Sequence, residues 1–359
     1  MSRNDTVGKN NPGNFFEDFR LGQVIRHATP RTVTAGDQAL YTALYGPRFA
    51  LQSSEVFARA CGLPAAPVDD LLAFHLVFGK TVPDISLNAV ANLGYADGRF
   101  VTPVYPGDTL SAESEVIGLK ENSNGKTGVV YVRTKGSNQR GEAVVEYIRW
   151  VMVKKGDPAA PAPEAVVPEL PESVAAADLR VPDGLDFAAF DDAAAGCRHR
   201  WGDYEPGERI DHGDAMTIEE AEHQLATRLY HNTARVHFNQ HVESQGRFGR
   251  RIVYGGHVIS LARALSFNGL AGAVKIAAIN GGTHAAPSFA GDTIYAWSEV
   301  LERIELSGRS DVGALRLRSV AAKNLACCQF PLKAVSEEGR AGYHPAVVLD
   351  LDYTVLLPR

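Results

Sequence analysis

The sequence predicts an α+β protein in which one structural unit, an antiparallel sheet wrapped around a central helix, occurs twice. Sequence motifs recur at a nearly constant spacing, and each half has an amphipathic helix, an apolar helix and a run of strands in the same order. A proline-rich segment separates the two copies. The chain has 359 residues, which is enough for two domains of ordinary size.

The internal repeat consists of three matches in the same order, offset by about 185 residues. Residues 19–27 match 204–212, residues 44–45 match 229–230, and residues 105–116 match 289–300. Any one of these matches would be weak evidence alone. Three in order indicate a tandem duplication, so we expect residues 1–155 and 199–359 to form the N-terminal and C-terminal units.

Residues 156–198 are expected to connect the two units. The first part, residues 156–171, is rich in proline and alanine. Because proline fixes φ and removes a backbone donor, this part should be stiff and extended. The remainder is rich in alanine and aspartate and gives no clear prediction.

Each unit is expected to open with an amphipathic helix. Thr34 and Asp37 have the spacing of a capping box, and Thr217 and Glu220 have the same spacing in the second half. After the second pair, apolar residues recur on one helical face at Ile218, Ala221, Leu225 and Leu229.

A more apolar helix should follow in each unit. It is expected to run over residues 70–78 and stop at Gly79 in the first half, and over residues 256–267 in the second. A helix that is apolar on most sides is normally buried. Segments rich in β-branched and aromatic residues then predict strands, at residues 128–134, 144–153, 314–320 and 347–357. Two such units could pair edge to edge, which would cover two open sheet edges.

Composition excludes several classes of protein. The net charge of −6 argues against a general nucleic-acid binder. No apolar run is long enough to span a membrane, and the first residues lack the apolar core of a signal peptide. The four cysteines show no C-x-x-C spacing, so neither a disulfide framework nor a zinc site is expected. We therefore expect a cytoplasmic protein with no nucleic-acid or membrane partner.

The segment at residues 230–239 is the strongest candidate for a functional site. Directly after the amphipathic helix of the second half it contains His231, Asn232, Arg235 and His237. Dense polar side chains on a loop are where a positioned acid or base is expected, although a solvated surface loop would look the same. A functional site is favoured because the first half contains an altered copy of this region.

These motifs resemble those of the MaoC-like (R)-specific enoyl-CoA hydratases in their tandem, double hot-dog form. Asn232 and His237 have the five-residue spacing of the Asp and His in that family's motif. Tyr254, Gly255 and Gly256 stand where the family has the element that opens the central helix, and residues 290–293 resemble its Pro-Gly-Asp-Thr element. Residues 14–22, 78–88 and 226–240 resemble the mesaconyl-CoA hydratases, also called β-methylmalyl-CoA dehydratases.

The resemblance implies a hydro-lyase that reversibly hydrates mesaconyl-CoA (2-methylfumaryl-CoA) to β-methylmalyl-CoA by syn addition of water, as in bacterial glyoxylate regeneration. Asn232 and His237 would be catalytic and would hold and activate the water. The backbone N–H of Gly255 would form the oxyanion hole, because a helix N-terminus presents free N–H groups. Tyr254 and Gly256 would contact the substrate. The resemblance further implies a CoA-thioester substrate, no metal or redox cofactor, and a homodimer.

Two departures from the family pattern stand out. Asn232 replaces an acid, and an amide can orient water but cannot take its proton; Glu243 could assist. In the first half, Pro47 and Gln52 fall opposite Asn232 and His237, so that half should be non-catalytic and help to form the CoA groove.

The free carboxylate of a mesaconyl group needs a cationic partner, for which arginine is best suited. Arg235 is the first candidate. The alternatives are Arg48 and the cluster Arg247, Arg250 and Arg251, which could equally meet the CoA phosphates.

Other polar residues are expected to serve the fold. His75 should be a core residue, His27 and His212 should have equivalent structural roles, and Asp108 and Asp292 should be turn residues. A metal site built from His223, His231, His241 and Glu243 matches no established spacing.

Three alternatives to a mesaconyl-CoA hydratase stay open: a hydratase of straight-chain enoyl-CoA, an acyl-CoA thioesterase, and a non-catalytic acyl-CoA-binding protein. A thioesterase normally needs a carboxylate, which Asn232 does not supply. The binding protein follows if Asn232 has disabled the site.

Overall fold

The computed structural model describes residues 9–335 and 339–359. Within these residues, ten strands form one antiparallel sheet in the order β1-β3-β4-β5-β2-β7-β12-β9-β8-β6. The first half contributes β1 (Val24–Thr32), β2 (Ala89–Phe100), β3 (Thr109–Glu121), β4 (Thr127–Ser137) and β5 (Ala143–Lys154). The second half contributes β6 (Arg209–Thr217), β7 (Lys275–Thr283), β8 (Thr293–Glu305), β9 (Val312–Lys323) and β12 (Val347–Pro358). A separate ribbon pairs β10 (Lys333–Val335) with β11 (Ala341–Tyr343).

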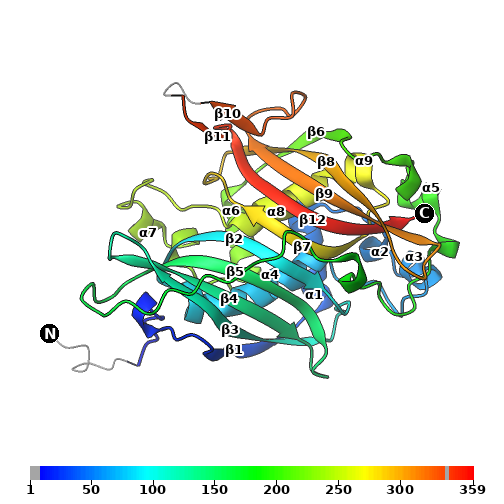
Figure 1. The fold of residues 1–359 in the computed structure, drawn as a ribbon. Helices are drawn as coiled ribbons and strands as arrows, with labels where there is room; N and C mark the ends of the chain where they lie inside the picture. The colour runs from blue at the N-terminus through cyan, green and yellow to red at the C-terminus, as the bar shows by residue number, and fades with distance from the viewer. Residues whose placement is uncertain (1–8, 336–338) are drawn as a thin grey trace.

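The two half-sheets meet where β2 pairs with β7 (Figure 1). Tyr95 lies opposite Gly282, and Arg99 lies opposite Ala278. Each half-sheet packs against its own central helix, α4 (Asp70–Thr81) or α8 (Gly255–Leu265), and one hydrophobic core includes residues of both helices. The predicted fold class, two antiparallel sheets each wrapped around a helix, is confirmed.

The first central helix does not stop at Gly79 as predicted but continues to Thr81. Gly79 does not end the helix; its lack of a side chain allows another segment of the backbone to pack closely against the helix. A Cβ at this position would collide with the carbonyl oxygen of Tyr230 and would lie 3.3 Å from the backbone nitrogen of Asn232. The loop that follows the first helix of the second half is therefore seated on the central helix of the first half.

The amphipathic helices are α1 (Ala35–Tyr45) and α6 (Glu220–Leu229). The predicted capping box of α1 is present, with the backbone N–H of Thr34 donating to Asp37 at 2.8 Å and that of Asp37 donating to the Thr34 hydroxyl at 3.2 Å. The predicted box of α6 is wrong, because Thr217 ends strand β6 and its hydroxyl is bonded to that of Thr293 at 2.8 Å. The N-cap of α6 is Glu219, two residues later than the predicted Thr217.

Short helices complete the fold. They are α2 (Ala50–Ser53), α3 (Glu55–Ala60), α5 (Asp192–Ala195), α7 (Gln240–Glu243) and α9 (Phe267–Leu270), with a π-helical turn at Val82–Ser86 and 3-10 turns at Phe16–Asp18, Ala176–Asp178, Phe187–Ala189, Trp201–Asp203 and Arg235–His237. The kink that contains Asn268 and Gly269 lies after α8, so this helix ends earlier than predicted, at Leu265.

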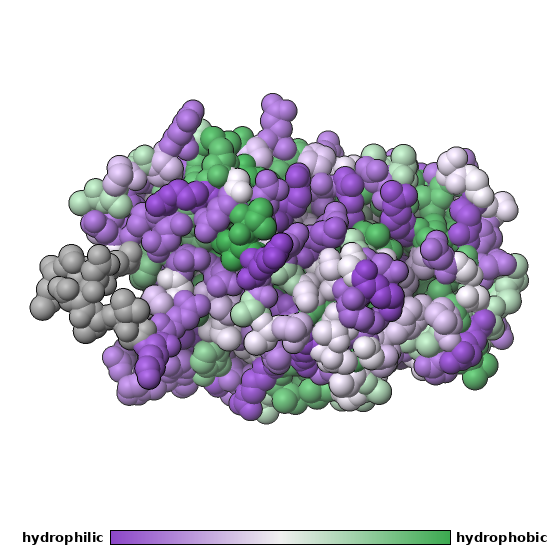
Figure 2. Space-filling view, turned by 90° about the horizontal axis from the view of Figure 1, so that it is seen from below, coloured by the Kyte–Doolittle hydropathy of each residue, from purple (hydrophilic) through white to green (hydrophobic). Residues whose placement is uncertain are grey.

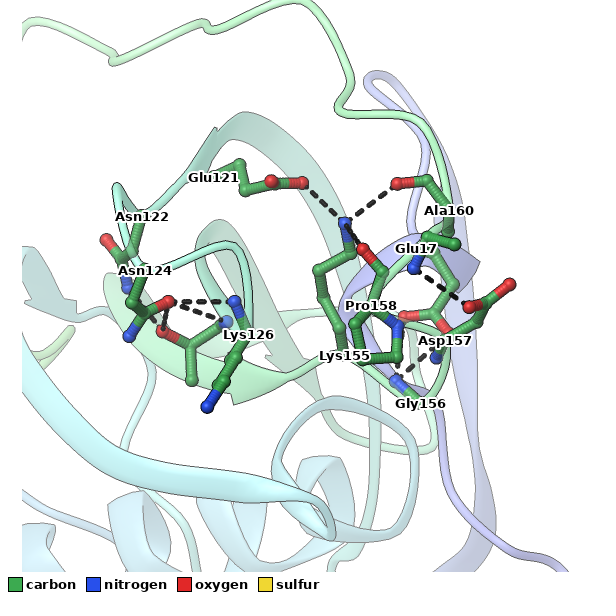
Figure 3. A network of polar contacts seen from close by, with 12 residues as sticks. Glu17, Glu121, Asn122, Asn124, Lys126, Lys155, Gly156, Asp157, Pro158 and Ala160 are labelled. Atoms are coloured by element: carbon green, nitrogen blue, oxygen red, sulfur yellow. Dashed lines mark hydrogen bonds and ion pairs between the residues drawn. The ribbon is translucent and has the colours of Figure 1, made fainter.

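The segment after β5 is fixed to the first half at its start (Figure 3). The buried ammonium of Lys155 donates to the carboxylate of Glu121 and to the carbonyl of Ala160, both at 2.8 Å. The carboxylate of Glu17 accepts the backbone N–H groups of Gly156 and Asp157 at 3.0 and 2.8 Å. These contacts hold the start of this segment against the strands of the N-terminal half.

The surface view in Figure 2 shows a face on which hydrophilic residues predominate and hydrophobic residues form small, separate patches. Among the residues described, no helix combines the length and apolar character that crossing a membrane requires.

Candidate active site

The candidate motif forms the loop between α6 and α7. His231 adopts the left-handed conformation, with φ of 53°, and thereby turns the chain out of α6. Asn232 follows and is only 5% exposed. Its side-chain oxygen accepts the backbone N–H of Ala234 at 3.0 Å, which fixes the plane of the amide.

His237 ends the 3-10 turn of this loop. Its Nδ1 lies 2.9 Å from the carbonyl oxygen of Ile252. Because a carbonyl only accepts, Nδ1 carries the proton and donates, and Nε2 is left with its lone pair. Burial lowers the pKa of His237 to about 4, so the imidazole is neutral at neutral pH and can accept a proton.

Tyr254, Gly255 and Gly256 form the start of α8 beside His237. The rings of His237 and Tyr254 are 5.6 Å apart between centroids. A Cβ on Gly255 would lie 2.7 Å from Nε2 of His284, and one on Gly256 would lie 2.3 Å from Cε1 of the Tyr254 ring. Glycine is needed at both positions because aromatic rings occupy the space of a side chain. Gly255 and Gly256 are the first two residues of α8, where backbone N–H groups lack an intrahelical partner and can bind an oxyanion, whereas the N–H of His257 donates to the carbonyl of Tyr254 at 2.9 Å.

His284 and Tyr95 also belong to this site, and the sequence argument missed both. The hydroxyl of Tyr95 in β2 is 3.2 Å from Nε2 of His284, which follows β7. Burial, with a further effect from His237, lowers the pKa of His284 to about 4. At the spacing of the repeat, His284 corresponds to Phe100. A position where the two copies differ in chemistry was the signal that could have identified it.

Behind the site, buried tyrosines and histidines link the two halves. Tyr230 donates to the hydroxyl of Tyr45 at 2.8 Å, and that hydroxyl is 2.9 Å from Nδ1 of His257. Nε2 of His75 lies 3.0 Å from the hydroxyl of Ser260, and burial lowers the pKa of His75 to about 3. His75 is therefore a hydrogen-bonded core residue, as expected.

The two equivalent histidines take equivalent places. His27 lies 2.8 Å from the hydroxyl of Ser114, and His212 lies 2.9 Å from that of Ser298, in each case through Nε2. Both histidines tie the first strand of a half to the next strand of its sheet.

The two turn aspartates also match each other. The carboxylate of Asp108 accepts the backbone N–H of Tyr105, and that of Asp292 accepts the N–H of Phe289, both at 2.9 Å. Both aspartates therefore act as turn residues.

The candidate arginines are spread over the surface. Arg235 is exposed on the motif loop. Arg48 lies 4.3 Å over the ring of Phe267, beyond the C-terminal end of α8, whereas the candidate site is at its N-terminal end. Arg250 lies 4.0 Å over the ring of Phe289, and Arg251 is ion-paired with Glu220.

Glu243 lies on α7 and is half-buried. Within the described part of the chain, no group of three or more His, Cys, Asp or Glu side chains is arranged to hold a metal ion.

Comparison with known proteins identifies the family. The family model described as mesaconyl-CoA hydratase matches residues 1–327. The chain belongs to the mesaconyl-CoA hydratase family. A β-methylmalyl-CoA dehydratase of Chloroflexus aurantiacus is 67% identical over 98% of this chain and 99% of its own length. A mesaconyl-CoA hydratase of Cereibacter sphaeroides is 64% identical over 98% of this chain and 100% of its own.

Solved structures place the chain in the same fold. The crystal structure of a MaoC domain protein dehydratase from Chloroflexus aurantiacus has a TM-score of 0.95 and 67% identity, over 98% of this chain and 99% of that one. A Mycobacterium tuberculosis protein with a double hot-dog fold has a TM-score of 0.73 and 27% identity, over 97% and 99%. The mesaconyl-CoA hydratase family member described here is thus a double hot-dog protein.

Proposed function

We propose that this protein is a hydro-lyase that reversibly hydrates mesaconyl-CoA to β-methylmalyl-CoA. The two relatives with these names support the substrate, because each matches the chain over nearly its whole length. The observation that supports the chemistry is the arrangement of His237. Its Nδ1 is committed to the carbonyl of Ile252, and its neutral Nε2 is left to accept a proton.

In the proposed reaction, Nε2 of His237 takes a proton from a water molecule as the water oxygen bonds to the β-carbon of the enoyl thioester. The same proton is then delivered from His237 to the α-carbon, so that both parts of the water add to one face. Asn232 orients the water by hydrogen bonding. Its amide plane is already fixed by the bond from Ala234, which limits the reorganisation needed when water binds.

As water adds, negative charge develops on the thioester oxygen. The N–H of Gly255 at the start of α8 would hold this oxygen, aided by the partial positive charge of the helix N-terminus. Tyr254 and Gly256 would contact the acyl group, and the exposed Arg235 would contact the substrate at the mouth of the site.

We further propose a division of labour between an N-terminal unit (residues 1–155) and a C-terminal unit (residues 199–359), joined by residues 156–198. The second unit would supply the acid–base residues. In the first unit, Gln52 donates from Nε2 to the carbonyl of Val274 at 2.8 Å, which is a structural contact between the halves. The N-terminal unit would complete the binding site for the CoA thioester.

The protein is proposed to act as a cytoplasmic homodimer, without a metal or redox cofactor, in a glyoxylate-regenerating pathway. The test of the function is the loss of enoyl-thioester ultraviolet absorbance on mixing the protein with mesaconyl-CoA, with crotonyl-CoA as the comparison. A strong preference for mesaconyl-CoA is expected. A preference for crotonyl-CoA would indicate a straight-chain hydratase, and no change with either substrate would contradict the proposal.

A further inference from the structure

Arg149 is a buried arginine without a carboxylate partner. It lies in β5 with 0% of its surface exposed, on the face that packs against α4. Its Nη2 donates to the hydroxyl of Thr81 at 2.7 Å and, at 3.4 Å, to that of Ser86. Nε and Nη1 are buried and have no hydrogen-bond partner. No carboxylate of residues 9–335 or 339–359 forms an ion pair with the guanidinium.

Such an arrangement is costly in the free protein. Burying an unpaired ion costs several kcal/mol, and arginine does not lose its proton in proteins. The ionisable groups that act on Arg149 are the phenols of Tyr147, Tyr95 and Tyr254, which are neutral at pH 7 and cannot balance its charge. A bound anion would therefore neutralise the positive charge of Arg149, which no side chain around it neutralises.

Two series of side-chain contacts connect the guanidinium of Arg149 to the candidate site. Across the sheet, Arg149 is directly opposite Tyr95, whose hydroxyl contacts His284 next to Gly255. Through the core, its Cζ lies 4.3 Å over the ring of Phe78.

The second series of contacts continues from Phe78 to His237, the proposed base. The rings of Phe78 and Tyr254 are 5.6 Å apart, and the ring of Tyr254 is 5.6 Å from that of His237. Two aromatic rings therefore separate the unpaired cation from the imidazole that accepts the proton.

We propose that Arg149 binds the free carboxylate of the substrate's acyl group. This inference rests on the proposed function, in which the substrate is an enoyl thioester bearing a carboxylate on the carbon that receives water. An anchor for that carboxylate must be shielded from water and face the candidate site. Arg149 is fully buried and lies opposite Tyr95, whose hydroxyl contacts His284. The exposed Arg235 would bind an anion only weakly, because exposed charge pairs are screened by solvent.

The assignment also gives the first half a chemical role. His237 comes from the second half, and Arg149 from the last strand of the first half. The first half has Pro47 and Gln52 at the positions that correspond to Asn232 and His237, yet it would decide which acyl group is accepted. Selectivity and proton transfer would thus be divided between the two copies.

The test compares kcat/KM for a substrate that carries the free carboxylate, mesaconyl-CoA, with kcat/KM for one that lacks it, crotonyl-CoA. In Arg149→Gln the kcat/KM for mesaconyl-CoA should fall about 100-fold or more, the usual effect of truncating one partner of a buried charge pair, while that for crotonyl-CoA should fall far less. Arg263→Gln is the matched control. Arg263 is also buried, at 6% exposure, but its guanidinium donates to Ser266 and Ala273 and lies 3.5 Å over the ring of Phe49. Its replacement should lower stability and leave the ratio of the two substrates unchanged.

If Arg149→Gln leaves the ratio of kcat/KM for mesaconyl-CoA to kcat/KM for crotonyl-CoA unchanged, the assignment is overturned and Arg149 is a structural residue. Arg149→Lys keeps the charge but not the planar fork, and should give an intermediate ratio. If neither variant folds, the parent protein is tested with the methyl ester of mesaconyl-CoA, which should react about 100-fold more slowly than the acid; equal rates would overturn the inference. A parent protein that does not hydrate mesaconyl-CoA at all would instead contradict the proposed function.

Discussion

Gly79 of the first half packs closely against the loop that holds Asn232 of the second half, and an added Cβ on Gly79 would lie 3.3 Å from the backbone nitrogen of Asn232. The same Cβ would collide with the carbonyl of Tyr230. The central helix of one half therefore sets the position of the loop that contains the candidate acid–base residues of the other. The two halves are thus in contact at this loop, although only the second half contains the candidate motif.

Gly79→Ala should displace this loop. We expect kcat to fall about 100-fold, because a displacement of about 1 Å at a positioned group costs roughly that much, together with a lower melting temperature. Gly36→Ala is the matched control, since Gly36 is also helical but its Cβ would only meet the Thr34 hydroxyl at 3.4 Å. Full activity in Gly79→Ala would show that the loop is not held by this contact.

Gly255→Ala tests the start of α8. The new Cβ would lie 2.7 Å from both ring nitrogens of His284, so either the imidazole or the helix N-terminus must move. We expect kcat to fall about 100-fold, similar to the loss of one oxyanion-hole donor. Gly202→Ala serves as the control because its Cβ would meet nothing within 4 Å. Equal activity of the two variants would argue against a role for Gly255.

The pH dependence of kcat/KM should report His237. The imidazole must be neutral to accept a proton, and burial lowers its pKa to about 4. Activity should therefore be retained as pH falls through 6.5, the ordinary histidine value, and be lost only as pH approaches about 4. Rates extrapolated to the moment of mixing separate this limb from acid denaturation. An acid limb near pH 6.5 would mean that another group controls the reaction.

Stability should also fall in acid for a related reason. Burial lowers the pKa of His75 and His257 to about 3, and that of His212 to about 4. Between the folded and unfolded pKa values the unfolded chain binds more protons, so stability is fully present above about pH 6.5 and is lost progressively as pH falls toward 3. Each unit of pKa difference corresponds to about 1.4 kcal/mol. Melting temperatures at pH 7.5, 6 and 5 check this, and a flat profile would contradict it.

The sequence predicted the architecture well because the architecture depends on local patterns. The repeat, the apolar central helices and the runs of β-branched residues each leave a signal within a short window. The Thr34 cap was recognised correctly, but Thr217 was misread because strand β6 extends into the same pattern. Gly79 was interpreted as the end of a helix. In the structure, its lack of a side chain allows the backbone of Tyr230, far away in the sequence, to pack against the helix.

Contacts between distant residues explain what the sequence argument missed. Tyr95, Arg149 and His284 come from three different strands or strand ends, and only the register of the sheet brings them together. Arg149 did leave a trace, as a charged residue on the inward face of a mostly apolar strand. Without the fold, that position could not be told from an outward-facing arginine.

The central claim is that His237 transfers the proton, and the most direct test is the initial rate of mesaconyl-CoA hydration in His237→Gln. The matched control is His231→Asn, which changes an exposed histidine of the same loop to a residue that tolerates its left-handed backbone. We predict that His237→Gln loses about 1,000-fold in kcat, within the usual contribution of a general acid–base group, while His231→Asn stays close to the parent. A His237→Gln protein that folds and turns over at the parental rate would contradict the account.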